Sequence, residues 1–168
     1  QQSPVMLEGK SEVTESEART AAAAFCGVSP EELALDYQGE GTIPCYSFSS
    51  QSGISVDVSR TGGIVYRMSV YRDFGEPSLS SEEGVQHASA FLQEHGYPNM
   101  KESYHTLFEG TLTINFCAVQ DGVTLYPDLV KVSVALDDGS IIGFESRGYM
   151  MSHKIRTLEA VTDGAGVG

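Results

Sequence analysis

Apolar residues recur every three or four positions in two separate stretches of the chain, which is the spacing of a helix with one buried face. The first stretch follows Thr14 and the second follows Ser80, and their apolar positions are Ala18, Ala21, Ala22 and Phe25, then Val85, Ala88, Phe91 and Leu92. We therefore expect helices over residues 14–26 and 80–95. Gly27 and Gly96 stand where these helices should stop, because glycine tolerates the left-handed backbone of a helix end.

Both predicted helices begin with the same local signal. Glu17 follows Thr14 by three residues, and Glu83 follows Ser80 by three residues. In such a capping box the hydroxyl accepts from the third helical amide, and the glutamate reaches back to the amide of the cap residue. The repeated box indicates that the chain contains two copies of one structural unit.

Alternating apolar and polar residues follow each helix, which predicts strands with one buried face. Residues 46–48 resemble 114–116, so that Phe48 would match Phe116, and residues 54–58 resemble 130–134. A glycine-containing turn then follows in each copy, at 61–63 and at 137–139.

The fold class expected from this order is α+β, with two tandem units that each pack a helix on an antiparallel sheet of about four strands. We assign residues 11–75 to the first unit and residues 76–150 to the second. Residues 1–10 are expected to be disordered or a linker. Residues 151–168 are expected to be a linker or the start of a third unit.

Composition narrows the possible partners. The formal net charge is −13, from 23 acidic and 10 basic residues, so the surface should repel nucleic acids, anionic lipids and anionic glycans. A basic protein would instead be attracted. The sequence contains no apolar run long enough to cross a membrane, and residues 1–10 do not resemble a signal peptide.

The sequence contains no motif that indicates an enzymatic function. The acidic pairs at 31–32, 82–83 and 137–138 fall at predicted helix starts or turns, where capping and solvation explain them. The four histidines lack metal-ligand spacing, the three cysteines form no C-x-x-C, and no nucleophile or phosphate-binding motif occurs. We therefore predict no catalytic residue, no cofactor and no metal.

The predicted contact with a partner protein lies after the predicted strand at 114–116. The second copy has an insertion at residues 121–128, and we expect a loop over residues 125–129 that contains Tyr126, Pro127, Asp128 and Leu129. An exposed tyrosine is a common interface anchor. In the alternative, Tyr126 folds back over the sheet edge and Pro127 blocks further pairing there.

A basic tail near the end of the chain offers a second candidate contact. It begins at Tyr149 and continues with His153, Lys154 and Arg156. This tail could contact an acidic partner, or it could simply link the second unit to a following one.

Several of these segments resemble the YpeB family of spore germination proteins and its PepSY (peptidase propeptide and YpeB) domains. The similar segments are residues 91–100, 113–116, 120–123, 126–132 and 138–149, followed by His153 and Arg156. The resemblance covers residues 11–156. Proteins of this family also carry an N-terminal membrane anchor, a helical region and a third repeat, which are not found in this sequence.

The resemblance implies a non-enzymatic function. A YpeB-like protein would lie on the extracytoplasmic side of the inner spore membrane, held there by an anchor outside this chain. It would bind, stabilise and restrain a cortex-lytic hydrolase (SleB-like) until germination. The alternative is a propeptide-type peptidase inhibitor, whose sheet edge would occupy a protease cleft. A hydrolase with an unrecognised site is a third interpretation.

Overall fold

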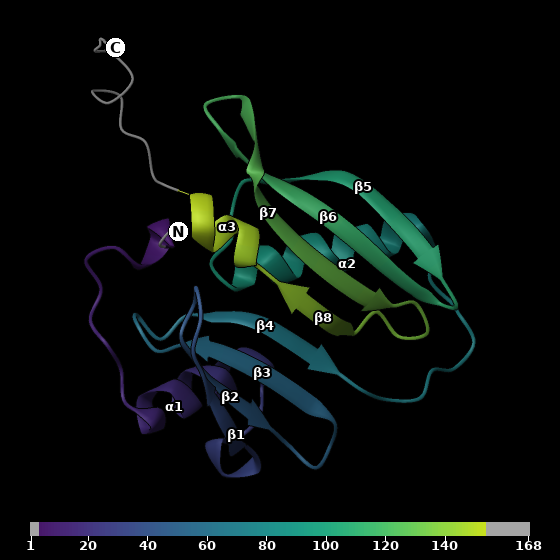
Figure 1. The fold of residues 1–168 in the computed structure, drawn as a ribbon. Coiled ribbons are helices and arrows are strands. Elements are labelled where there is room, and N and C mark those ends of the chain that lie inside the picture. The colour runs from purple at the N-terminus through teal and green to yellow at the C-terminus, as the bar shows by residue number, and fades with distance from the viewer. Residues whose placement is uncertain (1–3, 154–168) are drawn as a thin grey trace, which may run out of the picture.

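The computed structural model describes residues 4–153 of the chain (Figure 1). Within these residues, three α-helices, two short 3-10 helices and eight strands follow one another in this order: η1 (Val5–Leu7), α1 (Glu15–Cys26), η2 (Pro30–Glu32), β1 (Ala34–Gly39), β2 (Cys45–Ser49), β3 (Ile54–Ser59), β4 (Val65–Val70), α2 (Ser81–Glu94), β5 (Met100–Phe108), β6 (Thr111–Gln120), β7 (Val123–Ala135), β8 (Ile141–Glu145) and α3 (Arg147–Ser152). We call α1 with β1–β4 unit 1, and α2 with β5–β8 unit 2.

Both capping boxes are present. The amide of Glu17 donates to Thr14 Oγ1 at 3.1 Å, and the amide of Thr14 donates to Glu17 Oε1 at 2.8 Å. Ser80 and Glu83 make the same two bonds at 3.1 and 2.9 Å. Because these bonds satisfy amides that have no partner inside the helix, they fix both helix starts where the sequence predicted them. The first helix ends at Gly27, which adopts the left-handed conformation.

All eight strands belong to one antiparallel sheet, in the order β1-β2-β3-β4-β8-β7-β6-β5. Each unit contributes four strands, and the last strand of unit 1 pairs with the last strand of unit 2. We call this β4–β8 pairing the seam; it joins Arg67 to Glu145, Met68 to Phe144 and Ser69 to Gly143. The α+β class with two tandem units is therefore confirmed, and the seam makes the two four-stranded sheets continuous (Figure 1).

Both long helices cover the same face of this sheet. Directly paired residues of neighbouring strands point to the same face. One such row crosses six strands and is buried throughout: Phe48, Val56, Met68, Phe144, Val132 and Ile114. Phe48 and Val56 of unit 1 pack against α1, whereas Met68 joins the unit 2 residues in the cluster that packs against α2. We call the opposite side the open face.

The units are related by an approximate twofold axis that passes through the seam. In unit 1 the pairing of β3 with β4 shifts register just before Val58, which pairs with Val65. In unit 2 the pairing of β7 with β8 shifts just before Val134, which pairs with Ile141. The same bulge therefore occurs at the same place in both units, which confirms the predicted match of these strands.

The predicted match between Phe48 and Phe116 is wrong by two positions. Phe48 pairs with Val56, and Val132 is the equivalent of Val56 in unit 2. The residue that pairs with Val132 is Ile114, so Ile114 is the true equivalent of Phe48. Alternation alone cannot detect this error, because a shift of two residues leaves every side chain on the same face.

Aromatic side chains fill the space between the two helices above the seam. Phe25 of α1 and Phe91 of α2 contact each other edge to face, with ring centroids 5.6 Å apart. Both rings also contact Phe144, at 4.9 and 5.8 Å. His95 stacks on Phe91 at 4.0 Å. The two phenylalanines thus occupy equivalent positions and meet each other at the approximate axis.

Two of the expected boundaries need correction. Residues 1–10 are not simply a linker, because η1 forms at Val5–Leu7 and Leu7 is buried in a small core with Met150 of α3. The segment after residue 150 does not begin as a linker either, because α3 continues to Ser152. Residues 1–3 and 154–168 lie outside the described residues.

Candidate functional site

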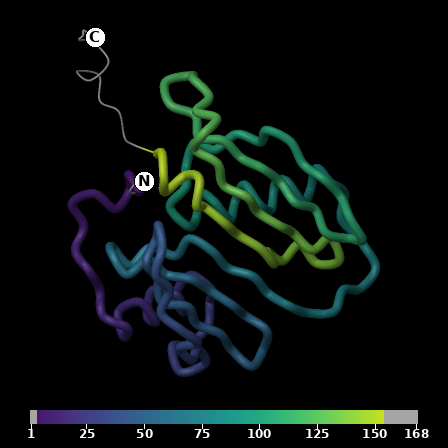
Figure 2. Tube along the Cα trace, in the orientation of Figure 1, coloured from purple at the N-terminus to yellow at the C-terminus, as the bar shows by residue number. Residues whose placement is uncertain are grey.

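The segment predicted to be a partner-binding loop lies inside a strand. The register of β6 with β7 jumps from the Cys117–Leu129 pair to the Ala118–Leu125 pair, which leaves residues 126–128 as an insertion within β7. Pairing resumes on both sides of the insertion, so the expectation of a loop is wrong. Pro127 has no backbone N–H to donate, which suits a position where the hydrogen-bond ladder between β6 and β7 is interrupted. Beyond the insertion, β6 and β7 form a hairpin that projects from the sheet (Figure 2).

Three of the predicted contact residues are exposed: Tyr126, Pro127 and Leu129. Tyr126 is 68% exposed, and Leu129 is also exposed although it is paired within the sheet. Tyr126 borders a hollow of about 160 Å³ lined by residues of three strands: Lys101, Glu102, Ser103, Cys117, Thr124 and Tyr126. Tyr126 thus places an aromatic side chain beside a small polar hollow, and Leu129 adds an exposed aliphatic side chain. That combination suits contact with another protein.

Asp128 requires a correction, because the residue is only 1% exposed. Its two carboxylate oxygens face the end of α3: Ser152 Oγ donates to Oδ1 at 2.7 Å, and His153 Nδ1 lies 2.7 Å from Oδ2. A buried carboxylate needs such partners. Asp128 therefore attaches α3 to β7 and offers nothing to a partner at the surface.

Tyr149 is also buried, which corrects its prediction as a surface contact. Its ring packs edge to face on Tyr97 at 4.9 Å and stacks on His153 at 4.1 Å. Burial raises the pKa of Tyr149 to about 12, and the nearby Tyr97 and Asp128 act in the same direction. The basic tail predicted with it is only partly described, since Lys154 and Arg156 lie outside the described residues.

The open face of unit 1 holds a connected polar network. Asp57 is buried and accepts from Ser47 Oγ at 2.7 Å and from Arg67 Nε at 2.8 Å. Arg67 also donates to Ser55 Oγ at 2.6 Å. The Asp57 carboxylate raises the pKa of Arg67 by hydrogen bonding. Because these donors and acceptors satisfy one another, the network stabilises the sheet rather than presenting a reactive group.

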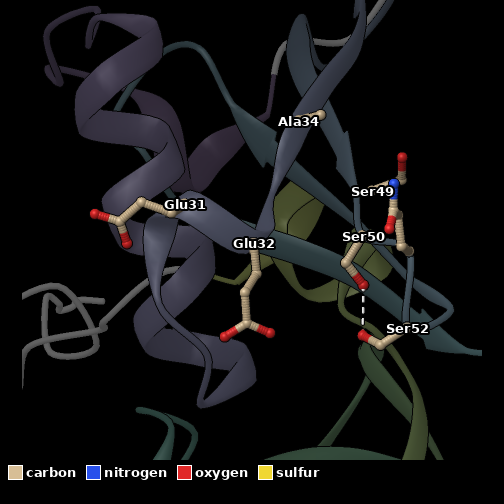
Figure 3. A pocket seen from close by; sticks show the side chains of 7 residues that line it. Glu31, Glu32, Ala34, Ser49, Ser50 and Ser52 are labelled. Carbon is tan, nitrogen blue, oxygen red and sulfur yellow. Dashed lines mark hydrogen bonds between the residues drawn. The ribbon is translucent and has the colours of Figure 1, made fainter.

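A larger hollow of about 610 Å³ lies at the outer side of unit 1, where η2 meets the turn between β2 and β3. Its lining is polar and small (Figure 3): Glu31, Glu32, Ala34, Ser49, Ser50, Gln51 and Ser52. Glu32 Oε2 accepts from the Ser29 amide and so serves to cap η2. Figure 3 shows Glu31 pointing away from the serines of the opposite wall. The two carboxylates therefore do not converge on a common point, as acid–base catalysis would require.

The described residues, 4–153, do not support a reactive cysteine or a metal-binding site. Cys26, Cys45 and Cys117 are free thiols, and burial raises the pKa of Cys26 to about 11, which keeps it protonated near neutral pH. No cluster of three or more potential metal ligands occurs within that range. No helix in the described part of the chain is long and apolar enough to cross a membrane.

The exposed strand β5 is a feature that the sequence analysis did not identify. It forms one edge of the sheet, and Tyr104, Leu107 and Phe108 on it are exposed. The available signal was residues 104–108 themselves, a run rich in strand-forming side chains. Only the structure reveals that, among residues 4–153, no neighbouring strand covers their outer edge.

A family model and curated relatives point to the same family of proteins. Residues 1–159 match the family model described as YpeB sporulation, PepSY1 and PepSY2 domains. The chain is 30% identical over 156 residues to the sporulation protein YpeB of Halalkalibacterium halodurans, covering 89% of this chain and 35% of the relative. It is 26% identical over 160 residues to sporulation protein YpeB of Bacillus subtilis, covering 90% of this chain and 35% of the relative. The chain thus spans about a third of the length of these curated relatives.

A solved structure shares the fold. The Bacillus megaterium YpeB C-terminal domain superposes with a TM-score of 0.78 and 23% sequence identity. The match covers 88% of this chain and 69% of that chain. At this identity the likeness supports the fold alone.

Proposed function

Because this chain belongs to the YpeB family of sporulation proteins, we propose that it is the non-enzymatic, protein-binding part of a spore germination protein. The proposed partner is a SleB-like cortex-lytic hydrolase, which the protein binds, stabilises and restrains until germination. The proposed location is the extracytoplasmic side of the inner spore membrane. The observation that carries this proposal is the family match over residues 1–159.

The chemistry of the described residues supports binding over catalysis. The hollows are small or open and polar, Glu32 caps η2, Asp57 accepts a hydrogen bond from Ser47, and the thiol of Cys26 has a raised pKa. Tyr126 and Leu129 supply exposed apolar area, and Leu129 lies on the open face, where it pairs with Cys117. With a net charge of −13, encounter with a basic region of the partner should be fast at low salt and slower as salt rises.

A titration of the hydrolase with the unmutated chain and with Tyr126→Ala tests this proposal. Removing a tyrosine anchor typically costs about 2 kcal/mol of binding free energy, which is roughly 30-fold in affinity. The melting temperature should change little, because Tyr126 is largely exposed. Tyr71→Ala is the matched control, since Tyr71 is 84% exposed and lies just after β4. Absence of binding by the unmutated chain and also by the whole extracytoplasmic region would contradict the partnership.

A second candidate function is peptidase inhibition of the propeptide type. The observation that favours it is the exposed edge of β5, because many peptidases hold their ligands as extended strands. The test is an inhibition assay against a panel of metallopeptidases. Inhibition that disappears in Tyr104→Ala but not in Tyr71→Ala would favour this function over restraint of a cortex-lytic hydrolase.

A further inference from the structure

The two edges of the sheet are protected to different degrees. At one edge, β1 is six residues long, its pairing with β2 shifts register between Leu35 and Tyr37, and Asp36 on it accepts from Ser49 Oγ. Shortness, a bulge and a charged residue are devices that keep an edge strand from pairing with another chain. The other edge, β5, is nine residues long.

Only the first part of β5 carries comparable protection. Its pairing with β6 shifts register between Glu102 and Tyr104, and Glu102 is engaged with His105 Nδ1. From Tyr104 to Phe108 the pairing is regular, and these five residues include no aspartate, glutamate, lysine or arginine. Alternate amides and carbonyls of this run point away from β6, because an antiparallel ladder uses only every second residue on each side.

Side chains on both faces of β5 remain available to a partner. Tyr104 and Phe108 pair with Asn115 and Thr111 and so lie on the open face, where they are 59% and 72% exposed. Leu107 pairs with the buried Leu112 and so lies on the helix-covered face, yet it is exposed as well. An added strand could therefore place alternate side chains against apolar groups on both faces.

Charge at the two ends of the run indicates the kind of strand that would fit. Glu102 precedes it and Glu109 follows it, on a chain whose net charge is −13. If two copies paired antiparallel with Tyr104 opposite Phe108, Glu102 of one copy and Glu109 of the other would occupy neighbouring positions. Like charges so placed are destabilising. A strand with basic residues at its ends would instead gain from both glutamates.

We propose that the outer edge of β5 binds an extended segment of another protein as an added antiparallel or parallel strand, through backbone bonds to residues 104–108. The bound segment has alternating apolar side chains and lysine or arginine at its ends. This inference rests on the proposed function only in treating the chain as a protein-binding module. It names a surface and a peptide chemistry that do not depend on which protein supplies the segment.

A synthetic peptide of alternating valine and threonine, flanked by arginine pairs, is the probe. Amide hydrogen exchange of the whole chain should slow for the outward-pointing amides between Tyr104 and Phe108 when the peptide is added, and not for β1. A peptide N-methylated at alternate backbone nitrogens should lose binding, because it cannot complete the ladder. Equal binding of the methylated peptide, slowed exchange at β1 instead, or no binding of the probe would each overturn the proposal.

Side-chain variants sharpen the test. Tyr104→Ala should weaken the peptide about tenfold, whereas Tyr71→Ala should leave its affinity unchanged. The double variant Glu102→Gln with Glu109→Gln should weaken the arginine-flanked peptide several-fold and leave a glycine-flanked one unaffected. Circular dichroism of each variant checks that it is folded. Slowed exchange at β5 that grows with chain concentration in the absence of peptide would overturn the proposal in favour of a second copy as the occupant.

The same variants separate this inference from the proposed function. Peptide binding without any hydrolase binding would leave the added strand standing and would contradict the hydrolase partnership. Hydrolase binding without peptide binding would overturn the added strand and support the partnership.

Discussion

Unit 1 and unit 2 have the same arrangement of strands, and they differ in chemistry at three equivalent positions of the open face: Ser47, Asp57 and Arg67 in unit 1, and Thr113, Ser133 and Gly143 in unit 2. The first set forms a charged network around a buried carboxylate. In the second set, two hydroxyls share one bond of 3.1 Å and the third position has no side chain. The helix-covered face, in contrast, is apolar in both units.

This difference shows on which face of the sheet the residue type is constrained. The helix-covered face must exclude water from the seam, so both units place large apolar side chains there. On the open face the polar side chains need hydrogen-bond partners, and different residues can supply them. The hydroxyl pair beside a glycine in unit 2 meets this requirement, and so does the ion pair in unit 1. Unit 2 adds longer strands and the exposed edge β5, whereas unit 1 ends in the short edge β1. The residues proposed to contact a partner, Tyr126, Leu129 and Tyr104, thus all lie in unit 2.

The largest expected effect comes from breaking the seam. Phe144→Ala should lower the free energy of unfolding by about 4 kcal/mol, because this buried ring contacts Phe25, Phe91 and Tyr97. Met68→Ala, at the equivalent position in unit 1, should cost about 3 kcal/mol. Denaturant unfolding measures both, with Tyr71→Ala as a surface control. A Phe144 effect smaller than the Met68 effect would contradict the central role of the aromatic cluster.

The next largest effect on stability is expected from removing side chains at equivalent positions of the open face. Asp57→Ala should destabilise the protein by about 2 kcal/mol, because it removes an acceptor for Arg67 and Ser47. Ser133→Ala, at the equivalent position in unit 2, should cost about 0.5 kcal/mol, since it removes one bond between neutral groups. Denaturant midpoints compare the two variants. Equal costs would mean that the charged network adds nothing to unit 1.

The helix caps should show no difference between the units. Thr14→Ala and Ser80→Ala remove the same cap hydroxyl and should each cost about 1 kcal/mol. Thermal unfolding of the two single variants, with the exposed Tyr71→Ala as reference, measures this. A clear inequality would show that one helix start depends on contacts beyond its capping box.

The smallest expected effect on stability near neutral pH comes from ionisation of the buried tyrosines. Burial raises the pKa of Tyr149 to about 12 and raises that of Tyr97 as well. Since the folded state favours the neutral phenol, this stabilisation is complete below pH 10 and is lost as the pH rises from about 10 to about 12. Unfolding measured at several alkaline pH values should show the loss. Tyr149→Phe should reduce it, and an unchanged pH profile in that variant would contradict the assignment.

Local signals in the sequence predicted the elements of each unit well. The capping boxes located α1 and α2 because a cap depends on residues only three apart. Alternation and glycine turns predicted the strands for the same reason. The seam was not predicted, because nothing within a few residues of Met68 or Phe144 shows that these strands pair with each other.

The candidate contact residues show the same limit. Asp128 and Tyr149 were expected at the surface from their residue types and their neighbours in the chain. The groups that bury Asp128, Ser152 and His153, lie 24 and 25 residues further along. Tyr126 and Leu129 were predicted together with them and are exposed, but their contact with a partner stays a prediction.

The seam also fixes an order of events during synthesis. β4 ends at Val70 and β8 ends at Glu145, so unit 1 leaves the ribosome well before the strand that completes it. At roughly 5–20 residues per second, the delay is on the order of ten seconds. Throughout that time β4 is itself a bare edge, with the charged Arg67 in its middle. A charge on an edge strand hinders pairing with a wrong chain. We therefore expect Arg67 to protect β4 from mispairing until β8 has been synthesised.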